Sequence, residues 1–454
     1  MKTTKSILII FAVMGINFTA SAADLLETYR AAQGQDSVFA AARGSQRAGQ
    51  EKLTQGRATL LPSVNFTAGS TYNRNELQNN DLPPNFQPLF AGASRFVSSS
   101  AAINLVMPLY RQNNWQMFSE AELQVAQSEA QFKNAEQDLI IRSAQAYFDV
   151  LAAQDVVEQT EAQKTAIAEQ LAQAKRNFEV GSATITDTLE AQARYDLVDA
   201  QTIAAISNLE IKERGYQQLT NAMPKNLQAI GSAFKLEIPQ PADQEKWVEQ
   251  AQQSNMQLLV AQAGAELADK AVVRNRGGHY PTLDMVASYG VNKITPVGDG
   301  TFGNGNNAQD TAATNAYIGL QLNIPLFQGG ATQSKWREAE ANRDRANAEL
   351  ESTRRTVGLQ TRQAYTGVVN GMRQVMALEQ ALKSSEKLLE ASKLGQEVGV
   401  RTNLDVLNAQ QQLFSTRRDL YQARYNYLIS RLKLKAAAGN LAEDELVMVN
   451  QALH

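Results

Sequence analysis

The sequence predicts a mostly helical protein that also contributes strands to a membrane β-barrel, and three observations lead to this fold class. Nearly the whole chain is duplicated at an offset of 218 residues. In each copy, short stretches of alternating apolar and polar residues give way to long helical stretches almost free of proline. The four strands are too few to close a barrel within one chain, so several chains must share it.

The first residues, 1–22, have the pattern of a secretory signal peptide. Basic residues precede an apolar run, and a small-residue cleavage site ends at Ala22. We therefore expect the mature chain to begin near Ala23, after export across an inner membrane. No later stretch reaches the roughly 18 apolar residues of a membrane helix, so no helical span is expected.

The composition argues against a catalyst or a nucleic-acid-binding protein. Cysteine is absent, which excludes disulfides and thiol chemistry. The two histidines are His279 and His454, so histidine-based catalysis or metal binding would depend on very few side chains. The net charge is -3, with both signs mixed along the chain. We expect no enzyme activity, no cofactor and no nucleic-acid partner.

An internal repeat organises the chain. Residues 180–192 and 398–410 are identical at seven of thirteen positions, and other segments align at nearly the same spacing. The predicted organisation is a first copy, 23–223, a proline-containing linker, 224–242, a second copy, 243–440, and a C-terminal tail, 441–454.

Each copy is expected to begin with a helix and to continue with a pair of strands, at 62–109 and 281–327. In the clearest strand Ile318, Leu320 and Leu322 alternate with polar residues. Each strand is expected to span about ten residues, which is enough for a tilted strand to cross a bilayer.

Polar loops are expected between the paired strands, at Arg74–Arg95 and Lys293–Thr314, on the outer surface. The second loop contains glycines around Asp299 and Asn304. A calcium-binding glycine-aspartate repeat is conceivable there, but the spacing is irregular, so a plain exposed loop is the preferred interpretation.

Long helical hairpins follow the strands, at 112–222 and 330–438. The stretch from Gln112 to Phe178 is uninterrupted and would be on the order of 100 Å long. Apolar residues recur in it every seven positions, which predicts coiled-coil packing against neighbouring helices along the whole length.

The residue pattern leaves the number of subunits open, because a dimer would bring eight strands together and a trimer twelve. A soluble periplasmic coiled-coil adaptor would also carry a signal peptide and heptads, but it would not need alternating strands. A secreted enzyme would need a nucleophile-base pair, a phosphate loop or a metal cluster, and the sequence has no such motif.

Several segments resemble the TolC family of outer-membrane efflux proteins, and the resemblance covers essentially the mature chain. They are Ala146–Phe148, Ile185–Asp187, Gly278–Asp284, Val398-Gly399 with Arg401-Thr402, and Tyr425–Ile429. The resemblance implies a homotrimer in the outer-membrane lipid. Its twelve-stranded barrel, with four strands from each chain, would continue as a coiled-coil α-helical barrel into the periplasm.

The same resemblance implies a function and partners. The trimer would be a passive exit duct for tripartite multidrug efflux and type I protein secretion. Its partners would be a periplasmic membrane-fusion adaptor and an inner-membrane efflux pump or ABC exporter. Docking of these partners would open the periplasmic end of the duct.

Each long hairpin turns at a glycine, Gly181 or Gly399, where a left-handed backbone can end the helix. Asp187 and Asp405 each follow a threonine by three residues, which is the spacing of a helix cap. The simplest interpretation is that both aspartates only satisfy helix ends.

The resemblance implies a second role for this turn, as a closed periplasmic entrance. By position, Arg401 is expected to contact Thr186 and Asp187 on the other hairpin. Gln396 stands where the family carries a tyrosine, which leaves the hydrogen bond made by that tyrosine open.

The constriction itself is expected four residues further along the same hairpin, 330–438, which would be the inner hairpin, with 112–222 as the outer one. Asp405 would line it, giving three carboxylates around a threefold axis that attract cations. Asn408 occupies the position of a second acidic ring, so this pore should be less negative than one with two such rings. The tips at Gly181 and Gly399 are the expected docking points for the adaptor.

Overall fold

The computed structural model describes residues 24–77, 92–231, 236–297 and 310–451. The predicted signal peptide, 1–22, lies outside the described residues, as do the centres of both predicted strand loops. The suggested calcium site in the second loop therefore also lies outside them.

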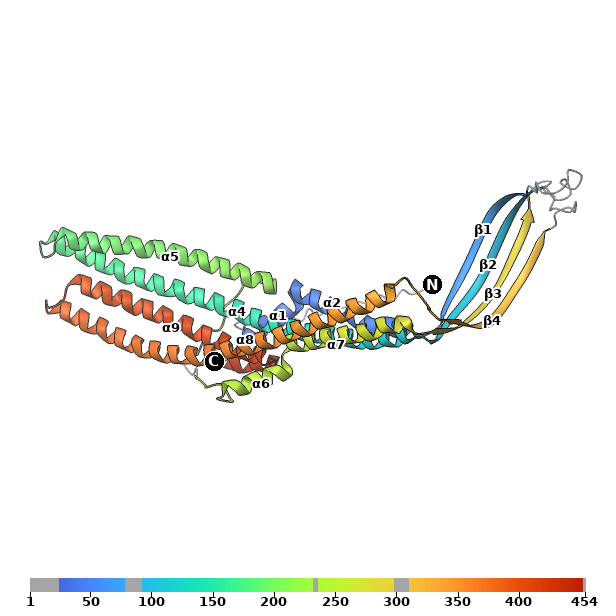
Figure 1. The fold of residues 1–454 in the computed structure, drawn as a ribbon. Coiled ribbons are helices and arrows are strands. Elements are labelled where there is room, and N and C mark those ends of the chain that lie inside the picture. The colour runs from blue at the N-terminus through green and yellow to red at the C-terminus, as the bar shows by residue number, and fades with distance from the viewer. Residues whose placement is uncertain (1–23, 78–91, 232–235, 298–309, 452–454) are drawn as a thin grey trace, which may run out of the picture. The chain divides into compact units, whose positions relative to one another are not determined.

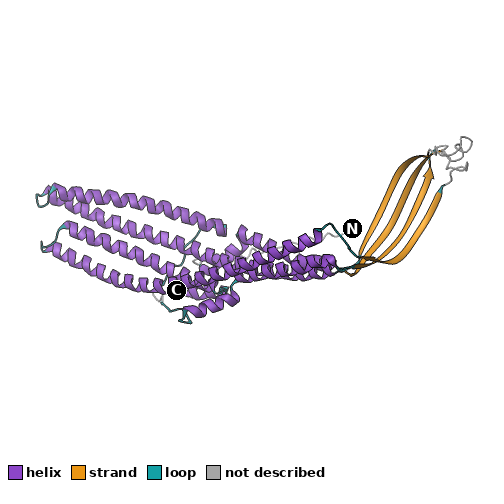
Figure 2. Cartoon of the chain, viewed as in Figure 1, coloured by secondary structure: helices purple, strands orange, loops and turns teal. Residues whose placement is uncertain are grey.

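Two compact units make up the chain. The helical unit contains the residues up to Ala42, together with Asn134–Asn255 and the chain from Val357 onward. The sheet unit contains Arg43–Lys133 and Met256–Thr356. In Figure 2 the strands connect at one end, through loops, to the helical segments of the same unit.

In the helical unit, two antiparallel helical hairpins lie side by side (Figure 1). Helices α4, Gln112–Glu179, and α5, Ile185–Thr220, form one hairpin. Helices α8, Ala331–Glu397, and α9, Asn403–Ala437, form the other. The part of α4 before Asn134 and the part of α8 before Val357 belong to the sheet unit. The predicted uninterrupted helix from Gln112 is present as α4 and spans 68 residues.

Aromatic side chains from both hairpins pack in the middle of this unit. Tyr147 and Phe148 on α4 are at most 1% exposed, as are Tyr427 and Leu428 on α9. The ring centroids of Phe148 and Tyr425 lie 5.5 Å apart. Burial of these large rings provides the apolar contact that the alanine-rich helix surfaces lack.

The helix expected before each strand pair is in fact two helices in both copies, which corrects the prediction. Helix α1, Leu25–Gln35, is followed by α2, Ser37–Ala58, and α6, Gln244–Ser254, by α7, Met256–Arg276. The single residues between them, Asp36 and Asn255, have extended backbones with ψ of 120° and 126°. Their side chains stabilise the break, because Asp36 accepts from Phe39 N at 2.9 Å and Asn255 donates to Ala437 O at 2.9 Å.

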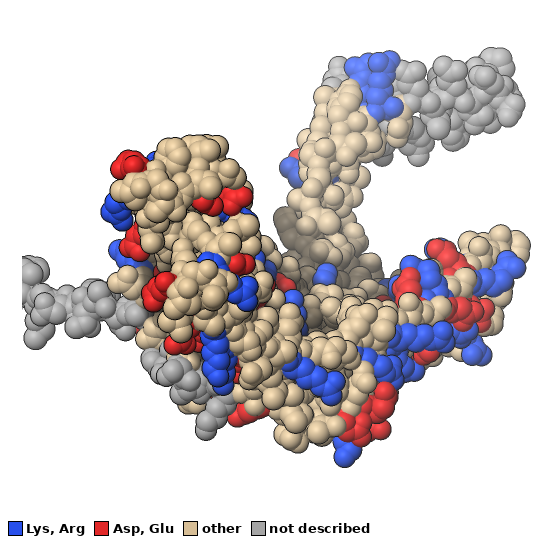
Figure 3. All heavy atoms as spheres, turned by 90° about the vertical axis from the view of Figure 1, so that its left-hand side faces the viewer, with Lys and Arg blue, Asp and Glu red and all other residues tan. Residues whose placement is uncertain are grey.

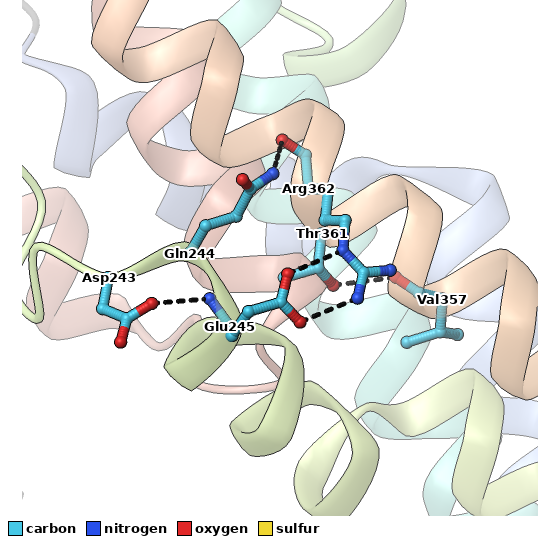
Figure 4. A network of polar contacts seen from close by, with 6 residues as sticks. All are labelled: Asp243, Gln244, Glu245, Val357, Thr361 and Arg362. Carbon is cyan, nitrogen blue, oxygen red and sulfur yellow. Dashed lines mark hydrogen bonds and ion pairs between the residues drawn. The ribbon is translucent and has the colours of Figure 1, made fainter.

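Helix α6 is attached to α8 by the polar network of Figure 4. Asp243 caps the helix by accepting from Glu245 N at 3.0 Å. The Glu245 carboxylate accepts from Nε and Nη2 of Arg362 at 3.0 and 2.8 Å, in a two-pronged ion pair. Gln244 adds a hydrogen bond to the Arg362 carbonyl at 3.2 Å.

The predicted C-terminal tail contains a helix, α10, Glu443–Gln451, which the sequence analysis did not anticipate. Arg30 on α1 donates to Glu443 Oε1 at 3.0 Å, and Asn450 donates to Asp24 Oδ2 at 2.8 Å. Leu446 and Val449 are buried beneath this contact. The helix therefore forms because it packs on the start of the chain, which no local pattern reveals.

The sheet unit carries an antiparallel sheet with the strand order β1-β2-β3-β4. The strands are β1, Ser63–Leu77, β2, Gly92–Tyr110, β3, Thr282–Pro296, and β4, Thr311–Asn323. They are 15, 19, 15 and 13 residues long, so the predicted length of about ten was too short.

The polar ends of the expected loops belong to the strands. Arg74 pairs with Arg95, and Lys293 pairs with Ala312, across neighbouring strands. Main-chain hydrogen bonds maintain this pairing, so the ladder continues beyond the stretch in which apolar and polar residues alternate. In the opposite direction β4 ends at Asn323 and leaves out the predicted extension to 327, where Pro325 has no N–H to donate.

Large apolar side chains project from the edge strands without cover. Phe66 on β1 is 70% exposed, and Ile318 and Leu320 on β4 are 74% and 68% exposed. In a single subunit these side chains have nothing to pack against, so the sheet is incomplete as a folded surface.

None of the helices in the described ranges is long and apolar enough to cross a lipid bilayer.

Acidic and basic side chains are interspersed over the helices in Figure 3. Many of them form ion pairs along one helix, such as Arg355 with Glu351 at 2.9 Å. This is the mixed, solvated surface that the charge balance predicts.

Candidate functional site

The tips of the two hairpins in the helical unit are built alike. Gly181 follows α4 with φ +77°, and Gly399 follows α8 with φ +79°. Beyond the glycines, Ser182 N donates back to Asn177 O, and Val400 N to Gly395 O, each at 2.8 Å. The left-handed glycine and this long backward bond end each helix and turn the chain through a few residues.

Reciprocal capping boxes begin both return helices. Asp187 N donates to Thr184 Oγ1 at 3.2 Å, while Thr184 N donates to Asp187 Oδ2 at 2.9 Å. Asp405 and Thr402 repeat both bonds at the same distances. Both aspartates therefore make the capping bonds that their spacing predicts, and their expected role at the entrance stays a prediction.

The caps also favour the charged form of the two aspartates. The hydrogen bond from the backbone N–H of Thr184 lowers the pKa of Asp187, and Thr402 lowers that of Asp405 in the same way. The positive charge of Arg401 adds a smaller lowering of the Asp405 pKa. Both carboxylates are therefore ionised at neutral pH.

Arg401 pairs with Asp405 inside its own hairpin, with Nη1 3.7 Å from Oδ1. The aliphatic part of its side chain lies over Gly395, where a Cβ would come within 2.7 Å of Arg401 Cγ. The expected contact of Arg401 with Thr186 and Asp187 stays a prediction. In the single chain the local i,i+4 pair takes its place.

A cleft of about 240 Å³ separates the two tips. Asp187 and Gln396 both line it, from different hairpins, so the structure brings these two predicted residues to one site. Gln396 Nε2 donates to Asn403 Oδ1 at 3.3 Å, on its own hairpin. Thr186 is exposed at the first turn of α5, beside this cleft.

The remaining predicted positions are Asn408 and the turn glycines. Asn408 is exposed on α9, and its Oδ1 accepts a hydrogen bond from Arg194 Nη2 of α5 at 3.1 Å. Beside the two glycines, Val180 and Val400 are 77% and 76% exposed. The tips therefore present bare apolar side chains, as a docking surface requires.

Sequence reasoning missed Arg194 and its second partner, Gln411, although Arg194 carries one usable signal. It follows Asp187 by seven residues, two helical turns, and so lies on the same face of α5. Nothing in the sequence indicated that this face meets α9.

In the described part of the chain, histidine, aspartate and glutamate side chains nowhere gather into a group of three or more that could hold a metal ion.

A family model described as "Outer membrane efflux protein" matches residues 28–222 and 247–440. Outer membrane protein TolC of Escherichia coli (strain K12) is 31% identical over all of this chain and 90% of its own length. Alkaline protease secretion protein AprF of Pseudomonas aeruginosa is 31% identical over 95% of this chain and 87% of its own length.

The fold is also similar to that of solved channels. The CmeC outer membrane channel of Campylobacter jejuni aligns with a TM-score of 0.76 and 17% identity, covering 94% of this chain and 89% of that one. Two full-length relatives at 31% identity and a family model that covers most of the chain lead to one conclusion. The chain belongs to the outer membrane efflux protein family.

Proposed function

We propose that this chain is one of three identical subunits of an outer-membrane channel, a passive exit duct for multidrug efflux and type I protein secretion. The uncovered sheet is the observation that carries the proposal. In the described chain, β1 and β4 are edge strands, and their large apolar side chains are mostly exposed. An unpaired main-chain group costs several kcal/mol in hydrocarbon, so other subunits have to complete the cylinder.

A trimer is the assembly that the family favours. Four strands from each subunit then give a barrel of twelve, and the four long helices of each subunit continue it as a coiled-coil barrel into the periplasm. The exposed apolar side chains of α5, among them Ile203 and Ile211 at 63% and 65%, would be covered by neighbouring helices.

Such a duct performs no chemistry on its cargo and has no energy source of its own. Its partners, a periplasmic membrane-fusion adaptor and an inner-membrane efflux pump or ABC exporter, would supply the energy for transport and select the cargo. The name of the relative AprF refers to protease secretion, which supports protein export as one use of the duct. The name of the family supports efflux as another.

The hairpin tips would act as the gate. In the trimer, Arg401 would exchange its 3.7 Å pair with Asp405 for contacts with Thr186 and Asp187 of the outer hairpin. Asp405 would then line the constriction as a ring of three carboxylates. Opening breaks charge-assisted bonds, so the docked partners must bind the open state more tightly than the closed one.

Planar-bilayer recording of the detergent-purified protein tests this function. The wild type is expected to remain oligomeric, to require detergent and to insert as a low-conductance pore. Arg401→Ala and Asp187→Ala are expected to raise the single-channel conductance. Arg418→Ala and Asp419→Ala are matched controls, because this pair lies exposed on α9, 3.3 Å apart and away from the tips.

Two outcomes would contradict the proposal in different ways. A monomer that stays soluble without detergent would exclude the shared barrel and favour a soluble coiled-coil adaptor. A conducting wild type whose conductance is the same in both tip variants and both controls would exclude only the gate.

A further inference from the structure

One side chain joins the two hairpins beyond the tip cleft. Arg194 on α5 donates from Nη1 to Gln411 Oε1 at 2.7 Å and from Nη2 to Asn408 Oδ1 at 3.1 Å. Both acceptors belong to α9, so the guanidinium group spans the boundary between the outer and the inner hairpin. Both acceptors are neutral amides, so they do not offset the positive charge of the guanidinium group.

We propose that Arg194 is a second latch of the gate and that it sets the charge of the constriction at the level of Asn408. The inference rests on the proposed channel function and adds a positioning residue to it. Asn408 lies one turn beyond Asp405, about 4.5 Å along the helix axis. In a trimer, the ring of three Asp405 carboxylates would be followed by a ring of three guanidinium groups.

The surroundings hold Arg194 in place. The next residue, Tyr195, packs on an apolar cluster formed by Ile167, Val198 and Leu407. That cluster joins α4, α5 and α9, and its three residues are each 3% exposed. Close packing fixes α5 and α9 relative to each other at this level. The guanidinium group can therefore bind its amide partners without the entropic cost of ordering a flexible segment.

The latch is not a general property of the duplicated unit. At the offset of 218 residues, Arg194 corresponds to Gln412 and Asn408 corresponds to Glu190. Gln412 makes a different bond, donating to Thr416 Oγ1 at 3.2 Å on its own helix. The cation therefore comes only from the outer hairpin and the amides only from the inner one.

Two substitutions change the latch in opposite directions. Arg194→Gln removes the charge and two hydrogen bonds from it, so the open-to-closed ratio is expected to rise at least roughly tenfold, the factor for losing one such bond. Multivalent cations should also block this variant at lower concentration, because the repelling ring is gone. Asn408→Asp gives Arg194 a carboxylate partner, so it should hold the channel closed more tightly and lower the conductance.

The experiment is a double-mutant cycle in planar bilayers, with the double variant Arg194→Gln/Asn408→Asp as its fourth member. In the Arg194→Gln background, Asn408→Asp should no longer lower the conductance and should instead strengthen cation block. Arg214→Gln is the matched control, because this arginine lies on the same helix and its partners Glu210, Gln217 and Met223 all lie within nine residues of it.

The inference is overturned if Arg194→Gln conducts like the wild type and the control, or if Asn408→Asp has the same effect in both backgrounds. A wild type that never conducts would count against the channel function instead. Amide hydrogen exchange then tests the latch by itself. Arg194→Gln should speed exchange in the first turns of α5 and α9 together, and unchanged exchange in both would refute the latch.

Discussion

Replacing Asp155 by asparagine is expected to stabilise the protein at neutral pH and to reduce the dependence of its stability on pH. Asp155 on α4 accepts a hydrogen bond at 2.6 Å from the hydroxyl of Tyr425 on α9, a residue that is 2% exposed. Burial raises the pKa of Asp155 to about 6. The negative charge of Glu158 adds to the rise, while the Tyr425 hydrogen bond opposes it.

The size of the effect follows from the two pKa values. The ordinary value of 3.8 describes the unfolded chain, and the folded chain holds the proton up to about pH 6. Because the folded state binds the proton more tightly, the free energy of unfolding falls as the pH rises through this window. At 1.36 kcal/mol per pH unit, the loss is at most roughly 3 kcal/mol for each subunit.

Asparagine removes the buried charge and keeps the hydrogen bond. Tyr425 can still donate to the amide oxygen. The fall in stability that the wild type shows as the pH rises to about 6 should therefore be absent in Asp155→Asn. Tyr425→Phe does the opposite, because it leaves a buried carboxylate without its donor. It should lower the free energy of unfolding at neutral pH by about 1–3 kcal/mol.

Chemical denaturation in detergent, followed by the circular dichroism of the helices, measures both effects across the window from about pH 4 to pH 8. The difference in stability between Asp155→Asn and the wild type should be small at the acidic end and grow to a plateau above pH 6. Subtracting the wild type removes the contribution of all other titrating groups. Parallel curves for the two proteins would refute the assignment of a raised pKa to Asp155.

Asp405→Asn keeps a side-chain oxygen that can accept from Thr402 N, but it removes the negative charge. Block of the channel by multivalent cations should therefore weaken, while the free energy of unfolding changes by less than about 1 kcal/mol. Undiminished block would place the constriction elsewhere. Gly399→Ala and Gly439→Ala impose the same left-handed strain, since both glycines have φ +79°, at a cost of about 1–2 kcal/mol each. Only at position 439 would the added Cβ collide with the Ser254 carbonyl, so the thermal midpoint should fall clearly further there. Equal midpoints for the two variants would contradict that packing.

Local patterns were sufficient to predict the long helices and their turns. The run from Gln112 has no proline before the glycine turn, and α4 extends from Gln112 to Glu179 as one helix. Gly181 and Gly399 end their helices because the signal, a left-handed glycine followed by a capping threonine, is contained within a few residues.

Strand ends and the additional helices could not be predicted in the same way. Arg74 and Lys293 belong to strands because their main chains pair with neighbouring strands. Main-chain pairing does not require alternating apolar and polar side chains, so the sequence pattern does not reveal it. Helix α10 depends on contact with Asp24 and Arg30, which lie more than four hundred residues earlier.

The candidate site also combines features set by local sequence with features set by distant contacts. The capping role of Asp187 and Asp405 is local, so spacing alone was enough to predict it. The contacts of Arg194 depend on the register between two hairpins, because its partner Asn408 is 214 residues away. A single sequence contains no signal for that register.

The distribution of burial along the hairpins indicates how far the gate can open. At the tips Val180 and Val400 are more than three-quarters exposed, and mostly polar side chains line the cleft between the hairpins. Water replaces such contacts at a net cost of about 0.5–1.5 kcal/mol each. The cluster of Ile167, Val198 and Leu407 joins the hairpins through apolar contacts at the level of Arg194. Exposing each of those side chains would cost about 1.5–3 kcal/mol. If the tips are the gate proposed above, a docked partner would separate them at low cost only near the turns, and we expect the opening movement to pivot at the level of Arg194.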